Sequence, residues 1–244
     1  MKYRVGIIGC GFIGVYAPDN HLRAYQDCPD TELVALCDKY KDSFTIEKSM
    51  LKVIDIAENV YADYKNMVKE FSFDIVSVCT PPETHCQIVC DMAPFVKAIY
   101  CEKPIALTLE EADKMIRVCH QHNVILQVNH QRRFMPVKVR FSRGIENTGT
   151  HMFDRLRQLF GELEGVVGNT YLFGKQPVEI EYINSPDHIF EIDCVRSPEP
   201  MILKGVEHLV ACLEGGYQSI SSGEEARQTL ALTLKFKEMY ERNK

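Results

Sequence analysis

The sequence predicts an α/β protein in which a doubly wound parallel sheet is followed by a smaller α+β domain with a mostly antiparallel sheet. In the first half of the chain, short β-branched runs alternate with amphipathic stretches, the pattern of consecutive βαβ units. After Asn129 this alternation stops, and strand-like segments follow one another across polar turns, which favours antiparallel pairing. We therefore expect two domains, residues 1–129 and 130–244.

The elements of the first domain are predicted from runs of strand length separated by stretches with helical spacing of apolar residues. The helix beginning at Leu109 has the clearest start, because Thr108 and Glu111 fit a capping box. The expected elements, in order, are strand 3–8, helix 13–26, strand 32–37, helix 64–71, strand 74–79, helix 83–92, strand 98–101, helix 109–122 and strand 124–128.

The second domain is predicted from weaker signals. It opens on a basic segment that Pro136 interrupts, and beyond that proline the parallel rhythm is lost. The last helix has two candidate N-caps, Ser221 and Ser222. The expected elements are helix 150–160, strands 165–173, 178–184 and 188–195, and terminal helices 204–213 and 223–240.

Composition narrows the classes of protein. A chain of 244 residues with 45% hydrophobic and 25% charged residues is typical of a globular protein, and a net charge of −6 disfavours a nucleic-acid surface. No apolar run is long enough to cross a bilayer, and the first residues lead directly into a strand, so we expect a cytoplasmic protein. Cysteines such as Cys10, Cys37, Cys79 and Cys101 lie in or beside apolar runs without CxxC spacing. They are expected to be buried free thiols, and no metal site is predicted.

A glycine-rich motif follows the first strand and opens the first helix. It reads Gly9-Cys10-Gly11-Phe12-Ile13-Gly14, the GxGxxG pattern of Rossmann dinucleotide-binding domains. Gly9 would permit the tight turn, Gly11 the approach of a pyrophosphate, and Gly14 the packing of helix on strand. The alternative is a glycine turn in a flavodoxin-like protein that binds no dinucleotide.

An acidic residue at the end of the second strand bears on the choice of cofactor. Asp38 stands where a carboxylate can accept hydrogen bonds from both adenine-ribose hydroxyls. The same carboxylate would repel a 2′-phosphate, so NAD is expected rather than NADP. Lys39 follows directly and keeps NADP open as a less favoured alternative.

Three segments resemble the Gfo/Idh/MocA family, which includes glucose-fructose oxidoreductase and inositol dehydrogenase. They are VCTPPETH at 78–85, CEKP at 101–104 and NTGTHMFD at 147–154. The resemblance implies an NAD(P)-dependent oxidoreductase that acts on a hydroxyl of a sugar, a cyclitol or a nucleotide-sugar, and a homo-oligomer, either dimer or tetramer. It also implies a cis bond before Pro104. Residues beside the cofactor would include Thr80, Pro81, His85 and Glu102.

Lys103 is the first candidate for catalysis. Alcohol oxidation by hydride transfer needs a group that takes the hydroxyl proton, and a lysine at the carboxyl end of a strand lies where open α/β sheets bind ligands. Desolvation and a cationic nicotinamide would both favour its neutral form. The alternative is a solvated lysine that pairs with Glu102.

His151 is the second candidate, as an acid/base or as the group that orients the substrate hydroxyl. Asn147 stands one helical turn earlier, where many family members have aspartate, and this change would make His151 a weaker base. Asparagine here resembles the branch that oxidises nucleotide-linked sugar acids. The alternative for His151 is an ordinary surface or core residue. Arg132 and Arg133 could bind a substrate carboxylate or phosphate, or could belong to a solvated face.

The second domain is shorter than the family's usual substrate domain. Two functions of different classes follow from this. The first is the oxidoreductase described above. The second is a non-catalytic dinucleotide-binding sensor or accessory protein with a degenerate substrate domain. The two hypotheses differ in whether Lys103 and His151 must converge on the nicotinamide.

Overall fold

A computed structural model describes residues 2–40, 59–134, 137–141, 163–167, 170–173, 176–182, 190–194 and 200–242. The chain forms two compact units, one of Met1–His130 with Ile202–Lys244 and the other of Gln131–Met201. The terminal helices, which the sequence analysis assigned to the second domain, are therefore grouped with the first unit.

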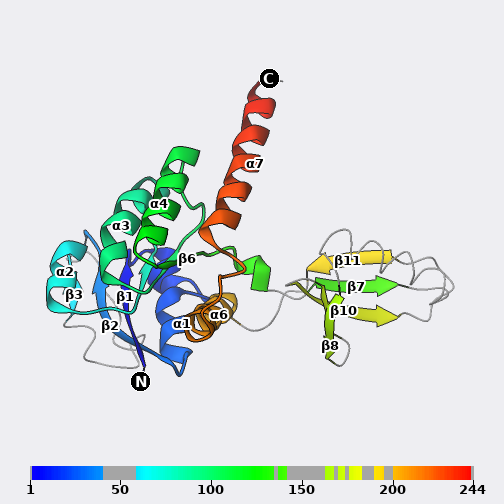
Figure 1. The fold of residues 1–244 in the computed structure, drawn as a ribbon, viewed down its shortest axis with the longest axis horizontal. Helices are drawn as coiled ribbons and strands as arrows, with labels where there is room; N and C mark the ends of the chain where they lie inside the picture. Colours follow the sequence, from blue (N-terminus) through cyan, green and yellow to red (C-terminus); the bar gives the residue numbers. More distant parts are fainter. Residues whose placement is uncertain are drawn as a thin grey trace. The chain divides into compact units, whose positions relative to one another are not determined.

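The first unit is built on a six-stranded parallel sheet with strand order β3-β2-β1-β4-β5-β6 (Figure 1). This is the strand order of a Rossmann fold, and it confirms the α/β prediction. The order reverses between β1 and β4, so the carboxyl ends of these two strands border the crevice where such sheets bind ligands. The strands are β1 (Tyr3–Ile8), β2 (Thr31–Cys37), β3 (Val60–Tyr61), β4 (Ile75–Val78), β5 (Ala98–Cys101) and β6 (Ile125–Val128).

Helices cover both faces of this sheet, and each face has its own apolar core. One core includes Met67, Val89, Met115 and Leu230, and the other includes Leu22 and Leu209. All residues of β4 and β5 are buried because both faces are covered. The helices are α1 (His21–Asp27), α2 (Tyr64–Glu70), α3 (His85–Met92), α4 (Leu109–Gln121), α6 (Met201–Gly215) and α7 (Gly223–Arg242).

Two helix starts were predicted from capping residues. At α4, the Thr108 hydroxyl accepts from the Glu111 N–H at 3.2 Å, and the Glu111 carboxylate accepts from the Thr108 N–H at 3.3 Å, which confirms the capping box. At α7, the hydroxyl that accepts the Glu225 N–H, at 3.4 Å, belongs to Ser222.

The terminal helices contact the parallel sheet and its helices. An ion pair joins Arg227 of α7 to Asp113 of α4. The Gln127 amide on β6 donates to the Gly205 carbonyl of α6 at 2.8 Å. These contacts explain why α6 and α7 complete the first unit. No helix in the described ranges is long and apolar enough to cross a membrane.

The first helix of the sheet differs from the single helix expected over residues 13–26. A π-helical turn covers Phe12–Tyr16, and α1 begins only at His21. Pro18 stands between them and cannot donate a helical hydrogen bond. The helix restarts with its own cap, because the Asn20 side chain accepts from the Arg23 N–H at 2.8 Å.

The second unit contains the five described strands that pair in the order β11-β7-β10-β9-β8. The β10 and β7 pair is parallel and the other pairs are antiparallel. Strand β7 was not predicted from the sequence. One strand was predicted over residues 165–173, where the structure has β8 and β9, because only Gly168-Asn169 separates these two strands in the sequence. The helix expected over residues 150–160 lies outside the described residues. The strands are β7 (Val137–Phe141), β8 (Leu163–Val167), β9 (Thr170–Phe173), β10 (Gln176–Tyr182) and β11 (Phe190–Cys194).

Candidate functional site

The glycine motif forms the turn between β1 and the π-helical turn. Gly9 has φ +95°, and a Cβ there would lie 2.6 Å from the Cys79 carbonyl carbon. A Cβ on Gly14 would collide with the Gly9 carbonyl oxygen. Gly11 differs from both, because among the described residues no atom beyond its chain neighbours lies within 4 Å of its would-be Cβ. Gly9 and Gly14 are therefore needed for packing, whereas Gly11 borders open space that a pyrophosphate could occupy.

Asp38 links the end of β2 to the glycine turn. One oxygen of its carboxylate accepts from the Cys10 N–H at 2.8 Å, and the other accepts from the Tyr40 N–H at 2.8 Å. The Lys39 ammonium lies over the Tyr40 ring, 4.7 Å from its centroid. Asp38 thus lies beside the glycine turn, while Lys39 packs on its own neighbour. The motif residues Phe12 and Ile13 follow in the π-helical turn, and Phe12 is exposed.

The thiols near this turn are buried. Cys10, Cys37 and Cys79 are all free, as is Cys101 on β5, and these four confirm the prediction of buried free cysteines. Burial raises the pKa of the Cys37 thiol to about 12, with the Asp63 and Asp38 carboxylates adding to the rise. Such thiols stay protonated near neutral pH and act as small core residues.

The carboxyl ends of β1, β4, β5 and β6 are held in register by backbone hydrogen bonds. The Cys79 N–H donates to the Ile8 carbonyl at 2.7 Å, and the Glu102 N–H donates to the Val78 carbonyl at 2.9 Å. The Asn129 N–H donates to the Cys101 carbonyl at 2.8 Å. The glycine turn, the Thr80-Pro81 turn and the Glu102-Lys103-Pro104 turn therefore lie along one edge of the sheet.

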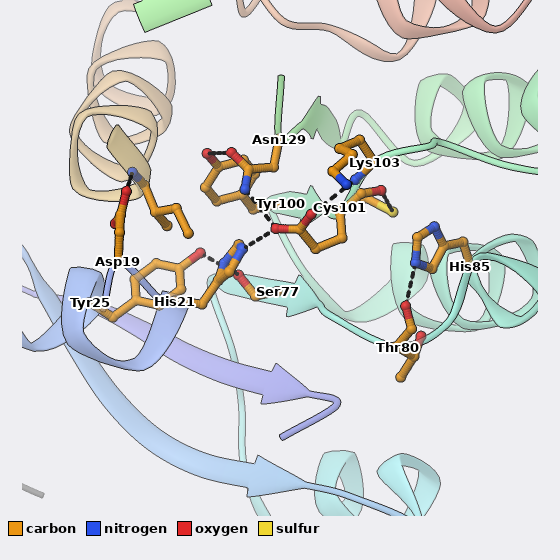
Figure 2. A network of polar contacts seen from close by, with 12 residues as sticks. Asp19, His21, Tyr25, Ser77, Thr80, His85, Tyr100, Cys101, Lys103 and Asn129 are labelled. Atoms are coloured by element: carbon orange, nitrogen blue, oxygen red, sulfur yellow. Dashed lines mark hydrogen bonds and ion pairs between the residues drawn. The ribbon is translucent and has the colours of Figure 1, made fainter. Parts of the chain in front are cut away.

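His85 connects two of these turns. Its side chain is fully buried, and Nε2 lies 2.8 Å from the Thr80 carbonyl oxygen (Figure 2). Nδ1 lies 3.0 Å from the Pro104 carbonyl oxygen. Both ring nitrogens are thus engaged with the protein backbone. We expect His85 to act on a cofactor indirectly, by holding the two turns that the sequence analysis placed beside the nicotinamide.

Lys103 is exposed at the sheet edge, and the Lys103-Pro104 bond is cis. Within the described part of the chain, the Lys103 ammonium forms no ion pair. Glu102, which the sequence offered as its alternative partner, is 5% exposed, and its carboxylate is taken up by other groups. The backbone N–H of Lys103 does donate to Glu102 Oε2 at 3.2 Å. The lysine side chain therefore remains available to a substrate.

A buried polar network holds the Glu102 carboxylate (Figure 2). Oε1 lies 2.9 Å from Nε2 of His21 and accepts from the Asn129 amide at 2.6 Å. Burial alone would raise the pKa of Glu102, but the hydrogen bond and charge of His21, with the Asn129 and Lys103 donors, hold it below its usual value. Glu102 is therefore a carboxylate at neutral pH, directly before Lys103 at the end of β5.

The sequence analysis missed His21, Ser77 and Asn129. Ser77 is a hydroxyl inside the otherwise apolar strand β4, and Asn129 is an amide directly after β6. Polar residues at such buried positions are a sequence signal from which a functional site at this edge could have been predicted. Nothing in the sequence pattern, however, pairs His21 with Glu102.

The remaining predicted site residues cannot be placed. Asn147 and His151 lie outside the described residues, and so does the side chain of Arg132. The structure therefore brings together the glycine turn, Asp38 and the turns at Thr80 and Lys103. The contribution of His151 to this edge stays a prediction.

Sequence comparison identifies relatives of this chain. The family described as "Oxidoreductase family, NAD-binding Rossmann fold" (GFO_IDH_MocA) matches residues 3–130. The rhizopine catabolism protein MocA of Rhizobium meliloti is 30% identical over 172 residues, which are 70% of this chain and 45% of that protein. The myo-inositol 2-dehydrogenase of Thermotoga maritima is 31% identical over 144 residues, 59% of this chain and 41% of that enzyme. The matched part spans less than half the length of these two relatives.

Solved structures share the fold. The WlbA dehydrogenase from Bordetella pertussis, in complex with NADH and UDP-GlcNAcA, is similar with a TM-score of 0.59 and 19% sequence identity. The similarity covers 96% of this chain and 94% of that chain. At this identity the likeness shows a shared architecture.

Proposed function

The chain belongs to the Gfo/Idh/MocA family of oxidoreductases with an NAD-binding Rossmann fold, and we propose that it transfers hydride between NAD and a hydroxyl of a sugar, a cyclitol or a nucleotide-sugar. One observation carries the proposal. The exposed Lys103, with no ion-pair partner in the described part of the chain, stands on the same sheet edge as the open glycine turn at Gly11. A cofactor bound along this edge would bring its reactive ring toward a group able to accept a proton.

The cofactor would be held by groups that the edge already orders. The open space at Gly11 and the backbone of the glycine turn suit a pyrophosphate, with Phe12, Ile13 and Gly14 forming the turn that follows. Asp38 would accept from the adenine ribose. The turn at Thr80 and Pro81, held by His85, and the Glu102 carboxylate would border the nicotinamide half. Bound NAD would supply the hydride acceptor.

The proposed chemistry assigns the proton to Lys103. When the alcohol is oxidised, its carbon gives up a hydride, and the neutral Lys103 amine takes the hydroxyl proton as the C=O bond forms. In the reverse direction the ammonium group returns that proton. His151 would orient the same hydroxyl or assist the transfer, with Asn147 four positions earlier in the sequence. Both residues lie outside the described part of the chain.

NAD should bind more tightly than NADP. Asp38 already places its carboxylate against the Cys10 N–H of the glycine turn, where a 2′-phosphate would meet a like charge. Asp38→Ser should narrow the difference between the two affinities, because serine keeps an acceptor and removes the charge. Calorimetric titration with both cofactors measures this. Equal or tighter binding of NADP by the unaltered protein would show that the Asp38 assignment is wrong.

The second unit is proposed to supply the substrate contacts and, with the rest of residues 130–244, a homo-oligomer interface. Relatives act on inositol, and a structurally similar dehydrogenase was solved with a UDP-sugar acid. Inositols and UDP-sugar acids are therefore among the substrate classes for a first test. Light scattering of the purified protein gives the oligomer size, and a dimer or tetramer is expected.

A screen of substrates separates the enzyme from its alternative. The second candidate is a dinucleotide-binding sensor that lacks catalysis, because the family match at residues 3–130 covers only the dinucleotide-binding part of the chain. Sugars, inositols and UDP-sugar acids are offered with NAD, and NADH absorbance is followed. We expect at least one of them to reduce NAD. If NAD binds and no member of a broad panel reacts, the sensor replaces the oxidoreductase.

A further inference from the structure

We propose that His21 is a positioning residue for the Glu102-Lys103 turn, fixing the Glu102 carboxylate so that it holds the Lys103 backbone and keeps an acceptor site open at the sheet edge. The proposal rests on the function proposed above, in which Lys103 and Glu102 serve the substrate and the cofactor. His21 itself is fully buried and touches neither. Its influence would pass through Glu102.

The hydrogen bonds around His21 are compatible with a ring that carries a proton on Nε2. The Tyr25 hydroxyl lies 2.7 Å from Ser77 Oγ, and either oxygen can donate, because burial raises the pKa of Tyr25 and this hydroxyl stays protonated. Ser77 Oγ lies 3.0 Å from Nδ1 of His21 and can donate to it. Nε2 of His21 then carries the proton and donates to Glu102 Oε1. Every buried polar group in this chain of contacts is satisfied.

A second chain of contacts reaches the same carboxylate oxygen from the other side. The Tyr100 hydroxyl donates to Asn129 Oδ1 at 2.8 Å, and the Asn129 amide donates to Glu102 Oε1 at 2.6 Å. Oε1 therefore receives two donors. Oε2 receives the Lys103 N–H, and the Glu102 side chain is 7% exposed. One acceptor position on Oε2 is left for a hydroxyl of a cofactor.

The start of α1 holds His21 in place. His21 is the first residue of the helix, directly after the Asn20 cap. The neighbouring Asp19 carboxylate accepts from the Ile202 N–H at the start of α6, at 3.2 Å and 3.3 Å for its two oxygens. The break between the π-helical turn and α1 thus gives α1 an independent, anchored start. Its first side chain, His21, labelled in Figure 2, lies within hydrogen-bond distance of Glu102.

Loss of His21 should weaken the hold on a buried charge. Without the Nε2 donor, the Glu102 carboxylate keeps only Asn129 and the Lys103 N–H, and burial then favours its protonated form. A protonated Glu102 would present a donor where the Lys103 N–H needs an acceptor. The turn that carries Lys103 would then lose the hydrogen bond from the Lys103 N–H to Glu102 Oε2.

Two substitutions at His21 isolate this contact. His21→Gln keeps an amide donor at the position of Nε2, whereas His21→Leu removes it, and neither new side chain titrates. Because the folded pKa of Glu102 is depressed, the stability it adds is present above its unfolded pKa and is lost as pH falls through the folded pKa. The free energy of unfolding of His21→Gln should exceed that of His21→Leu near neutral pH, and the difference should shrink as the pH falls through the folded pKa of Glu102. Urea unfolding at several pH values measures it, and a difference independent of pH would overturn the proposal.

Cofactor affinity provides the second readout. By calorimetry, His21→Leu should bind NAD about three- to tenfold more weakly than the unaltered protein, and His21→Gln within about twofold of it, because only leucine removes a hydrogen bond to a charged group. Tyr25→Phe is the matched control, since Ser77 can still donate to His21 without it, and its affinity should also stay within about twofold. NAD affinity of His21→Leu equal to that of the unaltered protein would contradict the positioning role. Failure of the unaltered protein to bind NAD would contradict the proposed function instead, and the unfolding comparison would still decide whether His21 holds the Glu102 carboxylate.

Discussion

Lys103→Met is expected to lower turnover by about two to four orders of magnitude, the usual contribution of a positioned acid or base, while NAD affinity changes little. Methionine has a similar length and cannot carry the proton. Because the side chain of Lys103 is exposed and forms no ion pair with a described residue, its removal leaves no buried partner unsatisfied. The loss should therefore appear in kcat with the active substrate found by the screen. His151→Ala should also slow turnover, but by less, because Asn147 gives that histidine no carboxylate.

Lys69→Met is the matched control for this variant. Lys69 is an exposed lysine on α2 whose ammonium donates to the Asn66 side chain at 3.2 Å, away from the edge that carries Lys103. The turnover of the Lys69→Met variant should equal that of the unaltered protein. Full activity in Lys103→Met would keep the enzyme and overturn the assignment of the proton carrier.

Gly11→Val should reduce NAD affinity by about a hundredfold or more and leave the fold intact. The backbone at Gly11 is extended, with φ −75° and ψ −160°, so valine needs no positive φ there, and among the described residues the space beyond its would-be Cβ is open. A branched side chain would fill the volume proposed for the pyrophosphate. The pyrophosphate would then lose one or more hydrogen bonds to the glycine turn, and each hydrogen bond to a charged group contributes about 1.5–3 kcal/mol. Calorimetry with NAD and a thermal melt of each protein measure the two effects.

Gly14→Val provides the contrast. A Cβ at Gly14 would collide with the Gly9 carbonyl oxygen, so this variant should lose stability as well as binding. If Gly11→Val is folded and binds NAD as tightly as the unaltered protein does, the glycine turn is not the pyrophosphate site.

Much of the sheet could be predicted because its strands are continuous apolar runs with turn residues beside them. The strands expected at 3–8 and 98–101 have the bounds of β1 and β5, and the Thr108 capping box is formed. The two-residue strand β3 was missed because so short an element produces no pattern. The first helix was drawn too long because apolar periodicity was followed through Pro18.

The candidate site could be predicted where its residues belong to contiguous motifs. Gly11, Asp38 and Lys103 each stand in a recognisable local pattern at the end of a strand. The contact between His21 and Glu102 joins positions 81 residues apart and depends on where a restarted helix meets two strand ends. No local pattern encodes such a contact, because it arises from tertiary packing. The role of His85 could not be predicted for the same reason. Its motif indicated proximity to the cofactor, whereas in the structure both ring nitrogens lie within hydrogen-bond distance of backbone carbonyl oxygens.

A crystal structure of the unaltered protein with NAD bound would test the proposed function most directly. In that structure the pyrophosphate should lie against the Gly11 backbone, Asp38 should accept from the adenine ribose, and the nicotinamide ring should lie beside Lys103. A cofactor hydroxyl should also donate to Glu102 Oε2, while His21 still holds Oε1. NAD bound away from the glycine turn, or a nicotinamide ring beyond the reach of the Lys103 side chain, would contradict the proposed function.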